Sequence, residues 1–282
     1  MIPGNANPLL LASAAADAAA AGPIKSVRFN DNDSAYLNRT PSSSGDRQKW
    51  TWSGWVKRTT LGTEGGIFST YGSAHPNTSL FWESDGLKFH DYTSSYQFRL
   101  GTTEKYRDPS AWYHIVLAYD STESTASDRA KLWVNGVLQT LSGTTVPSNH
   151  QTDWNSATQH DIGRFTAYFD GYMADVYFID GSALDYTSFG AFDDNGVWQA
   201  AAYSGTFGTN GFHLFDFANE SGIGDDSSGN DNDFTANNFT ALGPAATQFK
   251  VLGNASNTGS SSATNVSSLT TLQGTNVSTY NI

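Results

Sequence analysis

Two neighbouring segments between Ala111 and Thr140 constrain the fold of this chain more than any other feature. The first, AWYHIVLAYD, is apolar at odd and even positions alike, which is typical of a strand that is buried on both faces in a two-layer sandwich. The second, KLWVNGVLQT, places strand-like runs on both sides of Asn135-Gly136. That dipeptide accepts positive φ at both turn positions and predicts a hairpin. Together the two segments predict antiparallel β-structure with sheet packed against sheet.

Further strands are expected on both sides of this pair. KWTWSGWVKR carries tryptophans on both faces and predicts a second central strand, while FDGYMADVYFID predicts a long late one. GGIFSTY, TSLFWES, GLKFHDY and SYQFRLG follow one another at the close spacing of a meander. Turns are expected at residues 30–33 and 83–86, and a short helical turn at 182–189.

Composition excludes several kinds of partner and site. The formal net charge is -12, so nothing neutralises a phosphate backbone and no nucleic-acid partner is expected. No apolar run approaches the roughly 20 residues of a membrane-spanning helix, so no membrane insertion is expected. Cysteine is absent, which removes disulfides, zinc–thiolate sites and thiol nucleophiles.

The first 24 residues form an alanine-rich lead with two interpretations. Residues 9–16 could be the apolar part of a signal peptide, but no Lys or Arg precedes Lys25 and Asp17 interrupts the run. We expect instead a retained N-terminal arm with a short Ala-rich helix, which can lie close against another chain. A frayed terminus is the alternative.

The order of these segments resembles a known family. The segments WTWSGWVKR, WYHIVLAYD, KLWVNGVLQ, IGR and FDGYMADVYFIDG, in that order, resemble the laminin-G-type, concanavalin A-like jelly roll. The resemblance implies an all-β, antiparallel jelly-roll sandwich over residues 25–192. It implies little about activity, because this fold hosts lectins, enzymes and scaffolds.

The later part of the chain carries a second resemblance. DDNGVWQAAAYSGTFGTNGFHLFDFANE and DDSSGNDNDFTANNF resemble segments that accompany such jelly rolls in structural proteins of tailed bacteriophages. We expect residues 193–252 to complete or pack on the sandwich, because too few residues remain for a separate one. An unfinished second repeat is the alternative. Residues 253–282 are expected to be a polar tail or, in a fibre, an assembly segment.

Catalytic chemistry is not indicated. Concanavalin A-like glucanases use two carboxylates across the sugar cleft, usually in a Glu-x-Asp-x-x-Glu strand. The only Glu-x-Asp, Glu83-Ser84-Asp85, is expected to be a hairpin turn. The six histidines show no paired spacing, and His114, inside a strand, is expected to be a hydrogen-bonded core residue. We therefore expect no enzyme, with a glycoside hydrolase of unusual layout as an alternative.

Two kinds of binding site are candidates. Aromatic side chains near predicted turns could stack on sugar rings; they are Tyr71, Trp82, Tyr92, Tyr96 and Trp154. Acidic side chains near the C-terminal side could hold calcium; they are Asp225, Asp226, Asp231 and Asp233. Turn formation explains the same acidic residues without a metal, and no other cofactor is expected.

The two resemblances together imply a non-enzymatic phage virion protein, either a tail fibre or a capsid decoration. It would display a lectin-like domain on the particle surface, for attachment to host surface glycans or as a passive surface. The expected partners are other virion proteins, held through the N-terminal arm, and further copies of the chain, with a trimer favoured. The alternative is a secreted bacterial carbohydrate-binding module or adhesin.

Overall fold

Two central strands organise the fold. In the computed structural model, which describes residues 26–70, 77–215 and 222–239, β3 (Lys49–Arg58) pairs antiparallel with both β8 (Tyr113–Asp120) and β13 (Gly171–Asp180). Every residue of β8 is buried, and β3 is buried at all but two positions. The prediction of two central strands is therefore confirmed.

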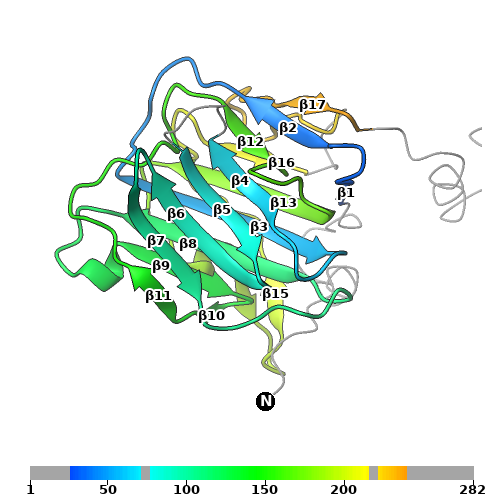
Figure 1. The fold of residues 1–282 in the computed structure, drawn as a ribbon, viewed down its shortest axis with the longest axis horizontal. Coiled ribbons are helices and arrows are strands. Elements are labelled where there is room, and N and C mark those ends of the chain that lie inside the picture. Colours follow the sequence, from blue (N-terminus) through cyan, green and yellow to red (C-terminus); the bar gives the residue numbers. More distant parts are fainter. Residues whose placement is uncertain (1–25, 71–76, 216–221, 240–282) are drawn as a thin grey trace, which may run out of the picture. The chain divides into compact units, whose positions relative to one another are not determined.

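The remaining strands complete two sheets that face each other (Figure 1). The seven-stranded sheet has the order β1-β13-β3-β8-β9-β10, with β16 also paired to β13; its further strands are β1 (Val27–Phe29), β9 (Ala130–Val134), β10 (Val137–Leu138) and β16 (Phe212–Leu214). The eight-stranded sheet comprises, in order, β11 (Leu141–Thr144), β7 (Tyr96–Thr102), β6 (Gly86–Tyr92), β5 (Asn77–Glu83), β4 (Gly65–Thr70), β12 (His160–Ile162), β2 (Tyr36–Arg39) and β17 (Thr235–Asn237).

Aromatic rings from both sheets fill the space between them. Trp50 stacks on Tyr119 at 4.9 Å within one sheet and meets Phe89 of the other sheet edge-on at 5.7 Å. Phe68 lies 5.8 Å from Phe178 across the same space. Rings of this size bury much apolar surface and favour such tilted and edge-on contacts. The all-β antiparallel sandwich is as predicted.

The predicted hairpins form with the expected backbone. Asn135 and Gly136 join β9 to β10 with φ of 50° and 74°. Ser84 and Asp85 join β5 to β6 with φ of 48° and 64°. Positive φ at both central positions matches the right-handed twist of the paired strands.

A second layer covers the outer side of the seven-stranded sheet. It contains the helical turn η2 (Tyr186–Ser188) and the hairpin of β14 (Gly190–Phe192) and β15 (Trp198–Ala200). Trp198 packs with Trp55, Trp112 and Ala174 of the sheet. The helical turn is shorter than predicted, because Asp185 accepts a hydrogen bond from the Thr187 N–H and caps a single 3-10 turn.

The described residues between 193 and 238 contribute strands to both sheets of the sandwich. β16 adds to β13 of one sheet, and β17 adds to β2 of the other. The described part of this segment therefore supplies a strand to each sheet. The chain divides into two units, Met1–Asn238 and Phe239–Ile282. The predicted arm at 1–24 and tail at 253–282 lie outside the described residues.

The described residues contain only two helical elements, η1 (Ala126–Asp128) and η2, of three residues each. Neither is long and apolar enough to cross a membrane.

Candidate functional site

Aromatic rings and two arginines gather on the outer side of the eight-stranded sheet. We call this surface the aromatic face; it consists of Tyr36, Phe81, His90, Tyr92, Tyr96, Arg99, Arg164, Phe165 and Tyr168. Strand register aligns Ser79, His90 and Arg99 across β5, β6 and β7. Because side chains alternate between the two sides of a strand, the neighbours Leu80, Phe89 and Leu100 turn inward to the core.

The β6–β7 hairpin forms the exposed end of the aromatic face. Tyr92 and Tyr96 meet edge-on at 5.0 Å, and His90 lies 5.4 Å from Tyr96. A register irregularity at Asp91 and Tyr92 lets Tyr96 reach the outer side of the sheet. The Arg99 guanidinium carbon is 5.2 Å from the Tyr96 ring centre, and Tyr96 is 49% exposed. These two tyrosines therefore keep the place that the sequence predicted, next to a turn.

A loop of residues 163–170 supplies the middle of the face. Phe165 packs on Phe81 at 4.9 Å and on His90 at 5.2 Å. The Ser69 hydroxyl donates to the Arg164 carbonyl at 2.7 Å, which fastens the loop to β4. The loop approaches β4 so closely that a Cβ on Gly66 would lie 2.3 Å from the Arg164 carbonyl carbon, so only glycine fits there.

The far end of the face carries a cation on a tyrosine ring. The Arg164 guanidinium carbon lies 3.7 Å from the centre of Tyr36, and Tyr168 is 6.1 Å from the same ring. Arg164 also forms an ion pair of 2.6 Å with Asp161, whose side chain is buried. Burial raises the pKa of Asp161, although Gln159 and Arg164 donate hydrogen bonds to it.

The charges on the aromatic face are paired. Arg99 forms an ion pair with Glu83, as Arg164 does with Asp161. Within the described residues, two buried polar atoms on this side of the sheet, Ser79 Oγ and Arg99 Nε, have no hydrogen-bond partner. The face can therefore offer ring surfaces and hydrogen-bond donors without a net charge of its own.

The prediction that Trp82 and Trp154 bind sugar is wrong, because both side chains are buried. Trp82 is 1% exposed and lies beneath the Arg58 guanidinium, 4.7 Å from its carbon. Trp154 is fully buried, and its Nε1 donates to the Thr78 carbonyl at 2.8 Å. Neither ring can stack on a ligand from solvent. Tyr71 lies outside the described residues.

The acidic cluster is also corrected, because its carboxylates cap backbone groups instead of converging. Asp226 accepts from the N–H groups of His213, Ser228 and Asn232 at 2.8–2.9 Å. Asp233 accepts from the Asp226 N–H, and Asp225 from that of Gly222. Asp231 is exposed in a turn with φ of 56°. No group of three metal-ligating side chains occurs in the described part of the chain.

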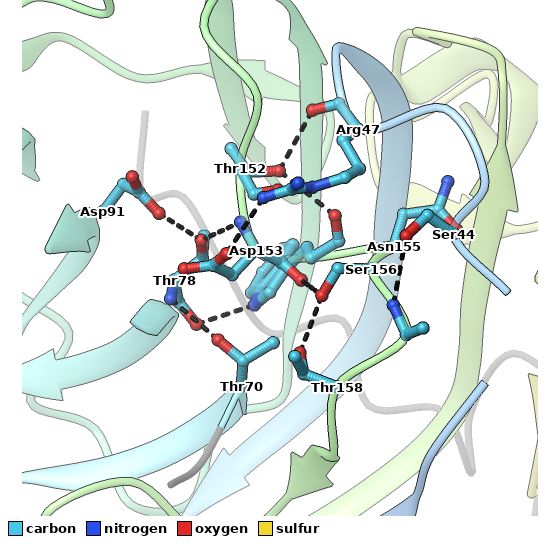
Figure 2. A network of polar contacts seen from close by, with 12 residues as sticks. Ser44, Arg47, Thr70, Thr78, Asp91, Thr152, Asp153, Asn155, Ser156 and Thr158 are labelled. Atoms are coloured by element: carbon cyan, nitrogen blue, oxygen red, sulfur yellow. Dashed lines mark hydrogen bonds and ion pairs between the residues drawn. The ribbon is translucent and has the colours of Figure 1, made fainter. Parts of the chain in front are cut away.

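A buried polar network, which the sequence did not predict, fastens the 145–159 loop to the sandwich (Figure 2). The Asp153 N–H donates to Thr78 Oγ1 at 2.7 Å, and the same hydroxyl donates to Asp91. His150 and Arg47 pair with Asp91 and Asp153 at 2.8 and 2.9 Å. Burial, followed by the nearby Asp91 charge, raises the pKa of Asp153. Both carboxylates are buried, so this network is structural rather than a site.

Sequence reasoning found only Tyr92 and Tyr96 of this face, and the members that it missed include Phe165, Tyr168 and Tyr36. They are far apart in the chain and meet only because β12 pairs with both β2 and β4. The only sequence signal is the aromatic content of RFTAYFDG after the IGR segment.

Comparisons with known proteins agree with this architecture. Residues 29–185 match the laminin-G family model of the concanavalin A-like lectin/glucanases superfamily. No curated protein matches the sequence. A solved structure of a putative carbohydrate-binding protein from Bacteroides ovatus aligns with 18% identity and a TM-score of 0.50, covering 76% of this chain and 58% of that one.

Two further solved structures align less closely. A SAP-like pentraxin from Limulus polyphemus has 17% identity and a TM-score of 0.42, over 56% of this chain and 76% of that one. Domains LG4-5 of the mouse laminin alpha1 chain have 16% identity and a TM-score of 0.42, over 64% and 49%. At such identities a likeness concerns the fold alone.

The family match covers more than half of the chain and includes the sandwich strands from β2 to β13. This chain therefore belongs to the laminin-G branch of the concanavalin A-like lectin/glucanases superfamily.

Proposed function

We propose that the chain is a non-enzymatic glycan-binding protein whose aromatic face is the binding site. The observation that carries the proposal is the pair of half-buried Tyr92 and exposed Tyr96, continued by Phe165 on the same side of the sheet. Sugar rings present apolar C–H surfaces that pack on aromatic rings, and their hydroxyl groups require donors and acceptors at the edges. The Arg99 guanidinium lies beside the Tyr96 ring, and Glu83 is paired with Arg99, so both kinds of group are at hand.

A neutral glycan is the ligand class that this surface favours. Both arginines of the face are already paired with carboxylates. The chain as a whole carries a formal net charge of -12, which repels anionic polymers. Binding would then depend on stacking and hydrogen bonds and little on salt.

The carboxylates of this face support a role without catalysis. Glycoside hydrolysis requires one carboxyl group that can donate a proton and a second, ionised one across the sugar. Here Asp161 is buried under its arginine, and Glu83 is held by Arg99. Neither is free to reach a glycosidic oxygen.

We further propose that the chain is a structural protein on the surface of a tailed-phage particle, as a tail fibre or capsid decoration. The resemblance of residues 194–240 to segments of phage structural proteins supports this, and those residues supply strands of the sandwich. The N-terminal arm would join it to other virion proteins, and a homotrimer would present several faces at once, which raises avidity for surface glycans. The alternative is a secreted bacterial carbohydrate-binding module or adhesin.

Glycan binding is tested with the full chain on an array of neutral polysaccharides and oligosaccharides. We expect saturable binding that Tyr96→Ala weakens by at least tenfold, which corresponds to about 1.4 kcal/mol. Tyr96→Phe keeps the ring and should retain most of the affinity. An array without any binding, or equal loss with both variants, would contradict the aromatic face as a glycan site.

The virion protein and the secreted bacterial module can be distinguished by locating the protein in its native source. A virion protein should co-purify with phage particles at a fixed copy number in mass spectrometry and keep residues 1–22. A secreted module should instead be found free in the culture medium with a processed N-terminus.

A further inference from the structure

One corner of the sandwich exposes an apolar surface away from the aromatic face. Six large hydrophobic side chains are exposed in the described residues, and four of them, Val137, Leu138, Phe192 and Val197, belong to two adjoining hairpins; their exposed fractions are 49%, 56%, 46% and 42%. We call these four residues the corner patch. The hairpins touch, because a Cβ on Gly136 would lie 2.8 Å from Phe192 Cζ.

A groove continues the corner patch toward the other sheet. It has a volume of about 320 Å³ and is lined by Leu138 together with Leu100, Ala130, Leu141 and Val146. Lys131 and Asp128, which form an ion pair of 3.1 Å, line the same groove. Leu138 belongs to both surfaces, so the patch and groove form one apolar track.

The topology explains why this corner is open. β10 has two residues and is the last strand of its sheet, and the chain then crosses to β11, the last strand of the other sheet. The groove lies where these two edges part. Exposed apolar side chains that adjoin an apolar groove are a feature of surfaces where another chain segment binds.

The chain contains a segment suited to this track. Residues 1–24 include one charged residue, Asp17, nine alanines and the run Leu9-Leu10-Leu11. By contrast, residues 253–282 are rich in Ser, Thr and Asn, with isolated apolar residues. An apolar strip of small side chains and leucines can lie close against an apolar groove.

The place where this segment joins the fold favours binding to the patch and groove of a neighbouring copy over binding to its own. Residue 25 leads into β1, at the edge of the seven-stranded sheet opposite to β10. The second layer of residues 182–210 covers the outer side of the sheet between these edges. We propose that residues 9–21 of one copy occupy the corner patch and groove of a neighbouring copy. Such a head-to-tail exchange can close into a ring, such as the trimer.

This inference deepens the proposed function by naming a partner for the N-terminal arm, but its test does not involve glycans. Because the chain has no cysteine, single cysteines report one contact each. Ala14→Cys and Leu138→Cys proteins, one of them enlarged by a tag, are mixed and mildly oxidised. We expect a disulfide between the two different chains in good yield, and mass spectrometry should map it to residues 14 and 138.

A matched control uses Leu61→Cys in place of Leu138→Cys. Leu61 is also an exposed hydrophobic, at 36%, but lies outside the patch and groove. The proposal is overturned if the mixed disulfide is absent or forms equally with Leu61→Cys. It is also overturned if an Ala14→Cys/Leu138→Cys chain cross-links only within itself.

Oligomer mass gives a second readout on the full chain. By light scattering, Leu10→Ser/Leu11→Ser and Leu138→Ser/Phe192→Ser should both shift the protein to monomer, while Leu61→Ser should not. Binding of each single chain to an array glycan should be unchanged in these variants. Loss of the oligomer with retained glycan binding supports the inference, and an unchanged mass for either double variant overturns it whatever the array shows.

Discussion

At the scale of single residues, the chain holds several ionisable groups in one protonation state by burying them. His114 lies between Ser53 and Trp198: its Nε2 is 3.0 Å from the Ser53 hydroxyl, and its Nδ1 accepts from Trp198 Nε1 at 3.2 Å. The accepting Nδ1 identifies a neutral ring with its proton on Nε2. Burial lowers the pKa of His114 to about 3 and that of His160 to about 4. The predicted core histidine is thus confirmed.

We expect these histidines to make the folded state acid-sensitive. Below pH 6.5 the unfolded chain protonates both rings, whereas the folded chain keeps His160 neutral to about pH 4 and His114 to about pH 3. The free energy of unfolding should therefore decrease as the pH is lowered, by up to about 1.4 kcal/mol per pH unit for each ring. Raised pKa values at Asp153 and Asp161 oppose this, because the folded state then takes up their protons first.

Urea unfolding at pH 7, 6 and 5 measures the effect. His114→Gln loses a packed ring and will be less stable at every pH. The quantity to compare is therefore the slope of the free energy of unfolding against pH. The stability of His114→Gln should depend less steeply on pH than that of the unchanged chain. Equal slopes would show that His114 does not contribute.

Asp226 is the residue on which the Asp-x-Ser-Gly-Asn-x-Asn turn depends. Its carboxylate accepts from three backbone N–H groups and from the Ser228 hydroxyl. Asp226→Ala leaves these donors without their acceptor and should lower the free energy of unfolding by about 3 kcal/mol. Because the carboxylate serves as a cap, thermal unfolding of the unchanged chain should give the same midpoint in calcium and in EDTA. A midpoint raised by calcium would contradict this account.

At the scale of elements, local patterns predicted the strands that are buried on both faces and missed those that pairing creates. β3 and β8 carry large apolar residues on both faces, and the Asn135-Gly136 turn is encoded in two residues. β14, β15 and β17 have three residues each, too few for a pattern. Their place depends on which distant strand they meet.

The candidate site was predictable only in part, because some of its residues are marked by local patterns and others are brought in by long-range contacts. Tyr92 and Tyr96 lie beside a turn and were found from the sequence. Trp82 and Trp154 lie near turns as well, but they face the core, and proximity to a turn does not tell which side of a sheet a ring takes. Phe165 joins the face through a loop whose path depends on Gly66.

Gly66 offers a direct test of that loop. Gly66→Ala would push residues 163–170 off the sheet, because its methyl group would overlap the Arg164 backbone. We expect weaker glycan binding and a lower melting temperature. Gly65→Ala is the matched control, since a Cβ there meets its nearest atom at 3.5 Å, an ordinary contact. Similar behaviour of the two variants would show that the loop does not position Phe165.

At the scale of the whole molecule, the sandwich is closed by residues that lie beyond the family-matched segment. β16 and β17 add a strand to each sheet, and their neighbourhood contributes to the core. Phe212 stacks on Phe178 at 5.7 Å and meets Phe234 at 4.9 Å and Phe68 at 6.0 Å. The laminin-G segment of residues 29–185 is therefore not the whole folding unit.

Two truncations define where the folding unit ends. A chain that ends at Phe192 loses Trp198, Phe212 and Phe234 from the core, and each such ring contributes about 3–5 kcal/mol. Because a domain is stable by only about 5–15 kcal/mol, this chain should lose its cooperative unfolding transition. A chain that ends at Asn238 keeps every described strand and the Asn238 side-chain bond to the Ser34 carbonyl. It should melt within a few degrees of the full chain in differential scanning calorimetry. If the chain ending at Phe192 melted at the same temperature, residues 193–238 would be an appendage, and closure by β16 and β17 would be wrong.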